Sequence, residues 1–339
     1  MLIAGTEPIR HHRCRMSQEL TPVAAPSLPT VLPDEIAAAR SYRDASRATS
    51  TRRAYEADWL RFGLWCRDKA MNPIPAPAAL VAVYLSSLAD AGLKPPTVAR
   101  AAAAIAYAHR QANQLPPHKS EDGAIIAEVM AGIRRSRLDG PDRKSPADGD
   151  VVMKVLWAIQ GDNLAAHRDR AIIAFGMAVA TRRSELVALT VADLAFEDKG
   201  VRVTIRRSKT DQEGAGAIVA VPDGRRLKPV TLLRAWLDAA GIIEGPVFRP
   251  LRKNNTTRDQ PLTGHAIAVI VKARVLVAGL DPARFAGHSL RAGFVTAAAM
   301  SGADVWKIQQ VSRHKSMQVL SGYVRDARLF DDHAGDGFL

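Results

Sequence analysis

The stretch RLDGPDRKSPADGD, residues 137–150, divides this chain of 339 residues into two parts. Gly140, Pro141 and Pro146 each interrupt a helix, and charged side chains replace the apolar periodicity found on either side. A chain of this length is long for one globular domain, so two domains are expected, each large enough to bury its own core. The predicted organisation is a mobile arm over residues 1–34, a helical domain over 35–140, a linker over 141–147, and a second domain over 148–339 that ends in a tail.

Upstream of this stretch the sequence predicts a bundle of four helices. TSTRRAYEADWLRFGLWCRD, residues 49–68, places Tyr55, Trp59, Phe62 and Trp65 at helical spacing behind a serine or threonine N-cap. We interpret these aromatic side chains as core rather than as a surface that stacks on bases. Three further helices are predicted at 76–91, 97–112 and 121–135. The arm before them contains several prolines and no sustained apolar period.

Downstream of it the pattern is again mainly helical, with a short interruption. VRVTIRR at 201–207 and AIVAVP at 217–222 read as two strands joined by a polar turn that contains glycine. Helices are predicted at 148–160, 163–180, 226–240, 263–278 behind Thr263, 288–300, 303–312 and 316–324. The second domain is therefore expected to be mainly α-helical with a small antiparallel sheet.

The charge of the chain points to a polyanionic partner. Its 47 Lys and Arg outnumber 34 Asp and Glu, which gives a net charge of +13 and a pI of about 10.1. Nucleic acid and an anionic membrane surface are the two candidates. The most apolar runs, 78–93 and 262–280, are interrupted by polar residues or too short to span a bilayer, so a cytoplasmic protein is the simplest interpretation. Cys14 and Cys66 have no partners at metal-ligand spacing, so no metal site is predicted.

Five short stretches of the second part contain residues able to meet a phosphate or to move a proton. They are ATRRSEL at 180–186, RRSKTDQEG at 206–214, GHSLR at 287–291, SRHKS at 312–316 and SGYV at 321–324. In the first, Arg182 and Glu185 are three residues apart, so the carboxylate can hold the guanidinium on one helical face. In the second, Lys209 lies at or near the tip of the predicted hairpin.

The other three stretches supply two histidines, an arginine and a tyrosine. His288 and Arg291 lie three apart at a helix start, near the positive end of the helix dipole. His314 precedes Tyr323 by nine residues, enough for a turn and a short helix to bring the phenol back. Each pattern taken alone also fits a surface ion pair, a chance spacing or a solvated side chain. Their order and spacing together are more specific.

With these five stretches in this order, residues from about 50 to 325 resemble the tyrosine recombinases, the family of phage integrases and Xer-type enzymes. The chain contains Arg, Lys, His-x-x-Arg, His and Tyr in the order typical of the family. The stretches SKTDQEG and HSLRAGF are close to the family's common sequence motifs. Two places depart from it. Ala180 and Thr181 stand where the family usually has a glycine and an aliphatic residue, and Arg313 stands where it usually has glycine.

The resemblance implies a fold, a chemistry and a set of residues. The fold is mainly α-helical, with an N-terminal four-helix core-binding domain of the SAM-like type and a catalytic domain of mixed helices with a small antiparallel sheet. The chemistry is site-specific cleavage and rejoining of DNA through a 3′-phosphotyrosine intermediate, without a metal ion or cofactor. The implied catalytic residues are Arg182, Lys209, His288, Arg291, His314 and the nucleophile Tyr323, with Glu185 in support of Arg182.

The resemblance also implies partners. These are double-stranded DNA with a specific recombination site, a homo-tetramer on two duplexes formed from a free monomer, an accessory directionality protein, and a place at the nucleoid. The tail from Arg325 to Leu339 either packs on a neighbouring protomer or frays. Two alternatives remain open: a topoisomerase with similar tyrosine chemistry, and a DNA-binding paralogue with weakened catalysis.

Basic residues on both sides of the linker are candidates for phosphate contacts, because such contacts supply most of the affinity for DNA. Basic residues on a helix face are also commonly just solvated. The candidates are Arg52, Arg53, Lys94, Arg100, Arg134, Arg135, Arg206, Arg207, Arg252, Lys253 and Arg258.

Overall fold

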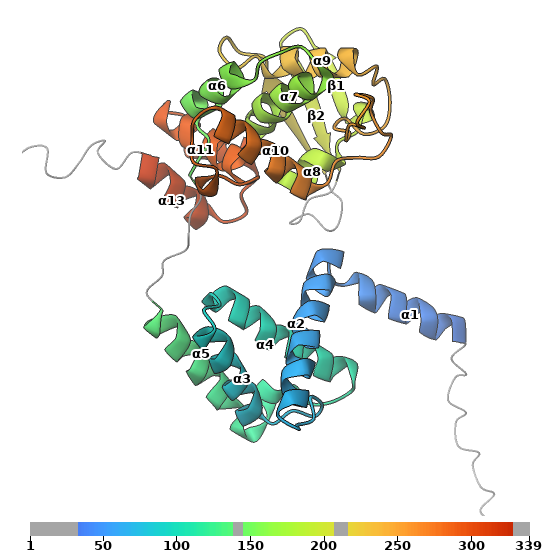
Figure 1. The fold of residues 1–339 in the computed structure, drawn as a ribbon, viewed down its shortest axis with the longest axis vertical. Coiled ribbons are helices and arrows are strands. Elements are labelled where there is room, and N and C mark those ends of the chain that lie inside the picture. Colours follow the sequence, from blue (N-terminus) through green and yellow to red (C-terminus); the bar gives the residue numbers. More distant parts are fainter. Residues whose placement is uncertain (1–32, 138–144, 207–215, 328–339) are drawn as a thin grey trace, which may run out of the picture. The chain divides into compact units, whose positions relative to one another are not determined.

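A computed structural model of the chain describes residues 33–137, 145–206 and 216–327, which are mainly helical with one small sheet (Figure 1). The chain divides into two compact units, Met1–Gly140 and Pro141–Leu339. Several predicted features lie outside the described residues. These are the arm over 1–32 with Cys14, most of the linker, the hairpin tip with Arg207 and Lys209, and the tail from 328 onwards.

The first unit contains the four predicted helices. Its elements are α1 (Pro33–Ala45), α2 (Thr49–Asp68), α3 (Ala78–Asp90), α4 (Pro95–Gln111), the 3-10 turns η1 (Pro117–Lys119) and η2 (Glu121–Gly123), and α5 (Ala124–Ser136). Helix α2 packs on α4, and α3 packs on α5. Phe62, Tyr84, Leu85, Val98 and Ile105 are almost fully buried between them. The apolar spacing that predicted these helices thus becomes one shared core.

Two details of this unit were predicted wrongly. Helix α1 was not expected, because the side chains of it that can be described are exposed and form no apolar stripe. The sequence features that mark its start are Pro33 at the first position and Asp34 and Glu35 in the first turn. Negative side chains there stabilise a helix by interacting with its dipole. The N-cap of α2 is Ala48, without a side-chain hydrogen bond, and not the expected serine or threonine.

The second unit begins with helices and then forms its sheet. The elements are α6 (Gly149–Ala158), α7 (Leu164–Ala178), α8 (Arg183–Ala188), η3 (Val191–Asp193), β1 (Leu194–Glu197), β2 (Gly200–Ile205), β3 (Ala217–Pro222), α9 (Pro229–Ala239), α10 (Gly264–Val277), η4 (Pro282–Arg284), α11 (Ser289–Met300), α12 (Val305–Ser312) and α13 (Met317–Ala327). Side chains of Asp148, Asn163, Thr263 and Asp304 cap α6, α7, α10 and α12. These caps satisfy backbone N–H groups that a helix start leaves free.

The sheet is antiparallel in the order β1-β2-β3. Val203 lies opposite both Leu194 of β1 and Val219 of β3. Strand β1 was not expected, because its four residues, LAFE, are too few to show a period. Alternate residues of β2 and β3 are buried against the core that also contains Trp236. The two predicted strands are present, although β2 ends at Ile205 and not at residue 207.

Helix α11 is central to the second unit, because it packs against both α7 and α13. It also lies against the chain that enters this unit, where the backbone N–H of Ala147 donates to the carbonyl of Ser289 over 3.0 Å. A Cβ on Gly293 would lie 1.8 Å from the Ala147 carbonyl oxygen, so only glycine permits this approach. Figure 1 shows α13 next to α11, with which it is in contact. This packing places the first turn of α11 and helix α13 next to the same region of the second unit.

Candidate active site

Arg182 and Glu185 form a tight pair at the start of α8. Arg182 is the N-cap residue, and its backbone N–H donates to Glu185 Oε2 over 3.0 Å while its Nη1 donates to Oε1 over 2.8 Å. A glutamate at the third helical position commonly reaches back to the N-cap in this way. Burial alone would raise the pKa of Glu185, but the hydrogen bonds from Arg182 outweigh it, so the pKa is lowered. The carboxylate is therefore ionised and fixes the guanidinium.

A second guanidinium shares the same carboxylate. Arg313, the C-cap residue of α12, donates from Nη2 to Glu185 Oε2 over 2.6 Å, across 128 positions of sequence. Its side chain is 14% exposed, and its Nε is buried without a hydrogen-bond partner in the part of the chain that the structure describes. The sequence marked Arg313 only as a departure from the family's glycine. No local spacing connects it to Glu185, so this contact was missed.

Arg291, on the first turn of α11, is almost fully buried. It is 2% exposed, and its Nη1 donates to the carbonyl of Ala180 over 2.7 Å. Its Nη2 is buried and has no partner among residues 33–137, 145–206 and 216–327. Burial, followed by the charge of Arg182, lowers the pKa of Arg291 to about 10, so it still carries its charge at neutral pH. A buried cationic donor with a free N–H fits an anion such as a phosphate.

The two predicted histidines lie beside these arginines and are neutral at neutral pH. Burial and the charges of Arg291 and Arg182 lower the pKa of His314 to about 4. Its Nδ1 hydrogen-bonds to the hydroxyl of Ser312 over 2.8 Å. His288 is the N-cap residue of α11 and remains exposed. Partial desolvation, then the charges of Arg291 and Arg182, lower its pKa as well.

Tyr323 lies on α13 beside this group. Its ring centroid is 6.3 Å from that of His314, at an interplanar angle of 47°. The residue is half-buried and packs against a small apolar cluster that includes Val295 and Leu320. Its charge, when ionised, acts on the buried Arg291. The structure therefore brings together every predicted catalytic residue that it describes, and Lys209 lies outside the described residues.

Both departures from the family's glycines fall on left-handed backbone. Ala180 has a φ of 49° and Arg313 a φ of 55°. Glycine adopts this conformation without a steric penalty, whereas other residues rarely do. The usual glycines thus have a conformational reason, and this chain keeps the same backbone with other residues. Thr181, the neighbouring departure, is buried, and its hydroxyl has no hydrogen-bond partner within the described ranges.

Nine of the predicted DNA contacts are exposed: Arg53, Lys94, Arg100, Arg134, Arg135, Arg206, Arg252, Lys253 and Arg258. Two of them also pair with a buried aspartate. Arg100 pairs with Asp58 over 2.7 Å and so connects α4 to α2. Arg206 pairs with the buried Asp193 over 2.5 Å at the end of β2. The last two therefore have structural partners, and their roles as phosphate contacts stay predictions.

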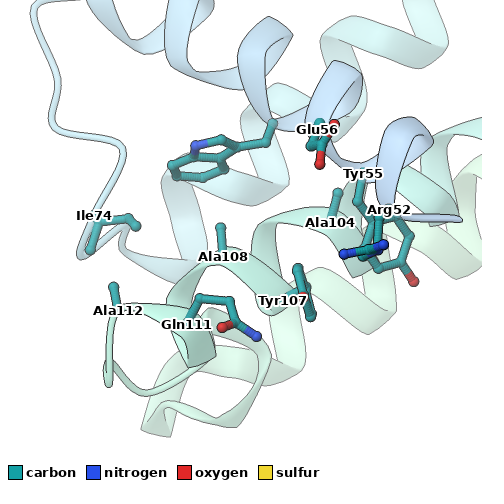
Figure 2. Close-up of a pocket in the computed structure, with 10 residues that line it drawn as sticks. Arg52, Tyr55, Glu56, Ile74, Ala104, Tyr107, Ala108, Gln111 and Ala112 are labelled. Carbon is teal, nitrogen blue, oxygen red and sulfur yellow. The ribbon is translucent and has the colours of Figure 1, made fainter. Parts of the chain in front are cut away.

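Arg52, also a predicted DNA contact, lines a cavity of about 400 Å³ between α2 and α4 (Figure 2). Tyr55 and Tyr107 stand in its wall with their ring centroids 5.6 Å apart. Of the aromatic residues on α2 that were expected in the core, Phe62 is fully buried, while Tyr55, Trp59 and Trp65 are only half-buried. This cavity belongs to the first unit and contains none of the predicted catalytic residues.

Neither a metal site nor a membrane span is found in the parts of the chain that can be described. Among them, no group of three or more His, Cys, Asp or Glu could hold a metal ion. No helix there combines the length and the apolar character needed to cross a bilayer.

Comparisons with known proteins match this geometry. Residues 148–328 match the model of the phage integrase family. An integrase/recombinase XerD homolog from Selenomonas ruminantium is 36% identical over 297 residues, which cover 86% of each chain. A tyrosine recombinase XerD from Pseudomonas aeruginosa is 25% identical, over 85% of this chain and 91% of its own.

Solved structures show the same fold. XerH bound to a palindromic difH substrate aligns with a TM-score of 0.55 at 19% identity, over 76% of this chain and 70% of its own. A lambda integrase dimer bound to a COC′ core site gives 0.54 at 18% identity, over 86% and 93%. The mainly helical fold with a three-stranded antiparallel sheet is therefore that of the tyrosine recombinases. On this fold, this family match and the sequence identity to the XerD homolog, the chain belongs to the phage integrase family of tyrosine recombinases.

Proposed function

We propose that this chain is a site-specific recombinase that cleaves and rejoins duplex DNA through a 3′-phosphotyrosine on Tyr323. Its family consists of enzymes that break and rejoin DNA, which gives the reaction class. The observation that supports the residue roles is the gathering of Arg182, Arg291 and His314 beside the phenol.

The two arginines are suited to stabilise the negative charge that develops in this reaction. A phosphodiester is already anionic, and its five-coordinate transition state gathers further charge on the non-bridging oxygens. Preorganised cationic donors stabilise that charge. Arg182 is fixed by Glu185, and Arg291 is buried with its Nη2 unpartnered among the residues that the structure describes. A guanidinium offers a planar fork of donors to two oxygens at once, which suits both residues to this role.

The remaining groups would handle protons. The phenol oxygen of Tyr323 attacks phosphorus, the bond from phosphorus to the 5′-oxygen breaks, and the linkage formed is a 3′-phosphotyrosine. A phenol has an ordinary pKa of about 10, so its proton must go to an acceptor. His288 is neutral because its pKa is lowered, and it takes this proton in our proposal. Lys209 gives a proton to the departing 5′-oxygen.

The alternative functions receive less support. A topoisomerase is not favoured, since the relatives and solved structures described above are recombinases and an integrase. A binding protein with weakened catalysis is not favoured either, because Arg182, His288, Arg291, His314 and Tyr323 are all present and assembled.

The partners follow from the same assignment. XerH and lambda integrase were solved with DNA, and the exposed basic residues of this chain, with its net charge of +13, suit a phosphate backbone. We propose that the chain acts at the nucleoid in the cytoplasm, as a tetramer on two duplexes that assembles from free monomers. An accessory protein would set the direction of exchange.

Covalent capture tests the proposed function. Full-length protein is incubated with a pool of duplexes of randomised sequence, each with a nick that lets a short strand diffuse away after cleavage. We expect adducts that survive SDS and share a recovered sequence, and we expect none from Tyr323→Phe. Sequence-specific binding without any adduct from the wild type would contradict the enzyme and support the binding protein.

The two arginines should affect cleavage more than binding. Arg182→Ala and Arg291→Ala are each expected to lower single-turnover cleavage by about a hundredfold to a thousandfold, because a donor aimed at the transition state is worth about 10²–10³. DNA affinity should change by less than about tenfold, since one phosphate contact among many is lost. Equal losses in cleavage rate and affinity would show that these residues bind the ground state as strongly as the transition state. That result would contradict the assigned role.

A further inference from the structure

We propose that Arg313 is a positioning residue of the active site, which acts through Glu185 to hold Arg182 and the His314 turn in one arrangement. The inference rests on the proposed function of that site and goes beyond it, because it assigns a role to a residue that does not touch the reacting atoms.

The shared carboxylate is the first support. Glu185 is 3% exposed, and each of its oxygens has a guanidinium partner: Oε1 accepts from Arg182 over 2.8 Å and Oε2 from Arg313 over 2.6 Å. Oε2 also accepts from the backbone N–H of Arg182 over 3.0 Å, so Arg182 by itself contacts both oxygens. Arg313 adds a second charge-assisted bond from a different element, and this bond ties the Arg182–Glu185 pair to the turn after α12.

The backbone of Arg313 is the second support. Its φ of 55° is unfavourable for a residue with a side chain. Its N–H donates to the carbonyl of Gln309 over 2.6 Å, and the side chain of Gln309 donates to the carbonyl of His314 over 2.9 Å. The turn before His314 is thus held to α12 by hydrogen bonds. Arg313 is the residue that connects this turn to α8.

The third support is the position of the Arg313–Glu185–Arg182 link, which we call the tether. His314 hydrogen-bonds Ser312 in this turn, and Tyr323 follows on the next helix, α13. Arg182 lies on α8, which is distant in sequence. The link through Glu185 thus joins the segment that supplies His314 and Tyr323 to the segment that supplies Arg182. Arg291 also connects these regions, through its bond to the carbonyl of Ala180, but only the link through Glu185 joins the side chain of Arg182 directly to the His314 turn among the described contacts.

The test uses a variant that separates strain from contact. Arg313→Gly removes the guanidinium and, at the same time, relieves the left-handed backbone, so the fold should not lose stability. We expect the single-turnover cleavage rate on the recovered nicked duplex to fall about tenfold or more, with DNA affinity within about threefold of the wild type. Arg313→Lys, which keeps a charged donor, should recover part of the rate.

Two controls sharpen this result. Lys228, the N-cap residue of α9, is also basic and left-handed, with a φ of 46°, but it lies outside the site, so Lys228→Gly should leave cleavage unchanged. In a cycle with Glu185→Gln, the effects of the two substitutions should be strongly non-additive, because both break one tether.

A cleavage rate for Arg313→Gly equal to that of the wild type would overturn the proposal. Losses of rate, DNA affinity and melting temperature in parallel would also overturn it, because they indicate a merely structural role. The Nε–H resonance of Arg182, followed by NMR in the DNA-free protein, gives a readout independent of activity. It should broaden or exchange faster in Arg313→Gly, and an unchanged signal would contradict the tether. If the wild type formed no covalent adduct, the proposed function would fail, while this resonance would still decide the role of Arg313.

Discussion

At the scale of single residues, the site combines strained backbone with buried charge. Ala180 is left-handed and fully buried, and its carbonyl accepts from Arg291. Its conformation is part of how the buried guanidinium is oriented. Such positions are rarely occupied by residues other than glycine, asparagine and aspartate, because a Cβ crowds the backbone there.

Replacing Ala180 by glycine should therefore cost little stability. The relief of about 1–2 kcal/mol from the left-handed backbone offsets the loss of a buried methyl and the added freedom of the unfolded chain. Ala174 is equally buried but lies inside α7, where glycine costs about 1 kcal/mol in propensity alone. Denaturant unfolding should find Ala174→Gly more destabilising than Ala180→Gly by about 1–2 kcal/mol. Equal losses would mean that Ala180 is not strained.

The lowered pKa of His314 makes stability depend on pH. Its pKa is about 4 in the folded protein against 6.5 ordinarily, so between these values the unfolded chain binds more protons. The stabilisation that neutral His314 contributes is therefore fully present above the unfolded pKa, and it is lost as the pH falls toward the folded pKa. Between pH 7 and pH 5 the wild type should lose about 2 kcal/mol through this residue. His314→Gln should lose correspondingly less in denaturant unfolding at the two pH values, and identical losses would contradict the shift.

Much of the site was readable at this scale. Arg182 and Glu185 were found because a spacing of three residues predicts a pair on one helical turn. The contact of Arg313 with the same carboxylate was not, because it depends on how α12 packs near α8, and no period in the sequence encodes that distance. The strain at Ala180 and Arg313 was visible only as a departure from two glycines.

At the scale of elements, helix α11 and the segment before α6 depend on each other. Gly293 allows the carbonyl of Ala147 to lie against the helix that carries His288 and Arg291. The long helices were predicted because apolar spacing and capping residues such as Thr263 act locally. Helix α1 and strand β1 were not, since one lacks an apolar face and the other is four residues long.

Adding one methyl group to Gly293 should disturb this contact. The Cβ would lie 1.8 Å from a backbone oxygen, so α11 or the entering chain must move. Gly293→Ala is expected to lose about 2–3 kcal/mol of stability, in the range of overpacked cores. Gly132 on α5 offers a matched control, because nothing lies within 4 Å of its added Cβ. Gly132→Ala should be neutral or stabilising by up to about 1 kcal/mol. A neutral Gly293→Ala in thermal unfolding would show that the contact is not tight.

At the scale of the whole molecule, residues from α8, α11, the turn after α12 and α13 meet in the second unit. They come from positions between 182 and 323 of the sequence, so only the fold of this unit can assemble them. The resemblance to the tyrosine recombinases predicted that these residues lie together, and the charge of +13 indicates a polyanionic partner. Composition alone left nucleic acid and a membrane surface open, because both are anionic.

The most direct measurement is the identity of the residue that becomes attached to DNA. Adducts captured from the nicked random-sequence pool would be digested with protease and nuclease, and the peptide carrying a nucleotide would be sequenced by mass spectrometry. We expect one modified peptide, with a 3′-phosphate esterified to Tyr323, and a free 5′-hydroxyl on the released strand. A nucleotide on any other residue, or a 5′-phosphate linkage, would contradict this expectation.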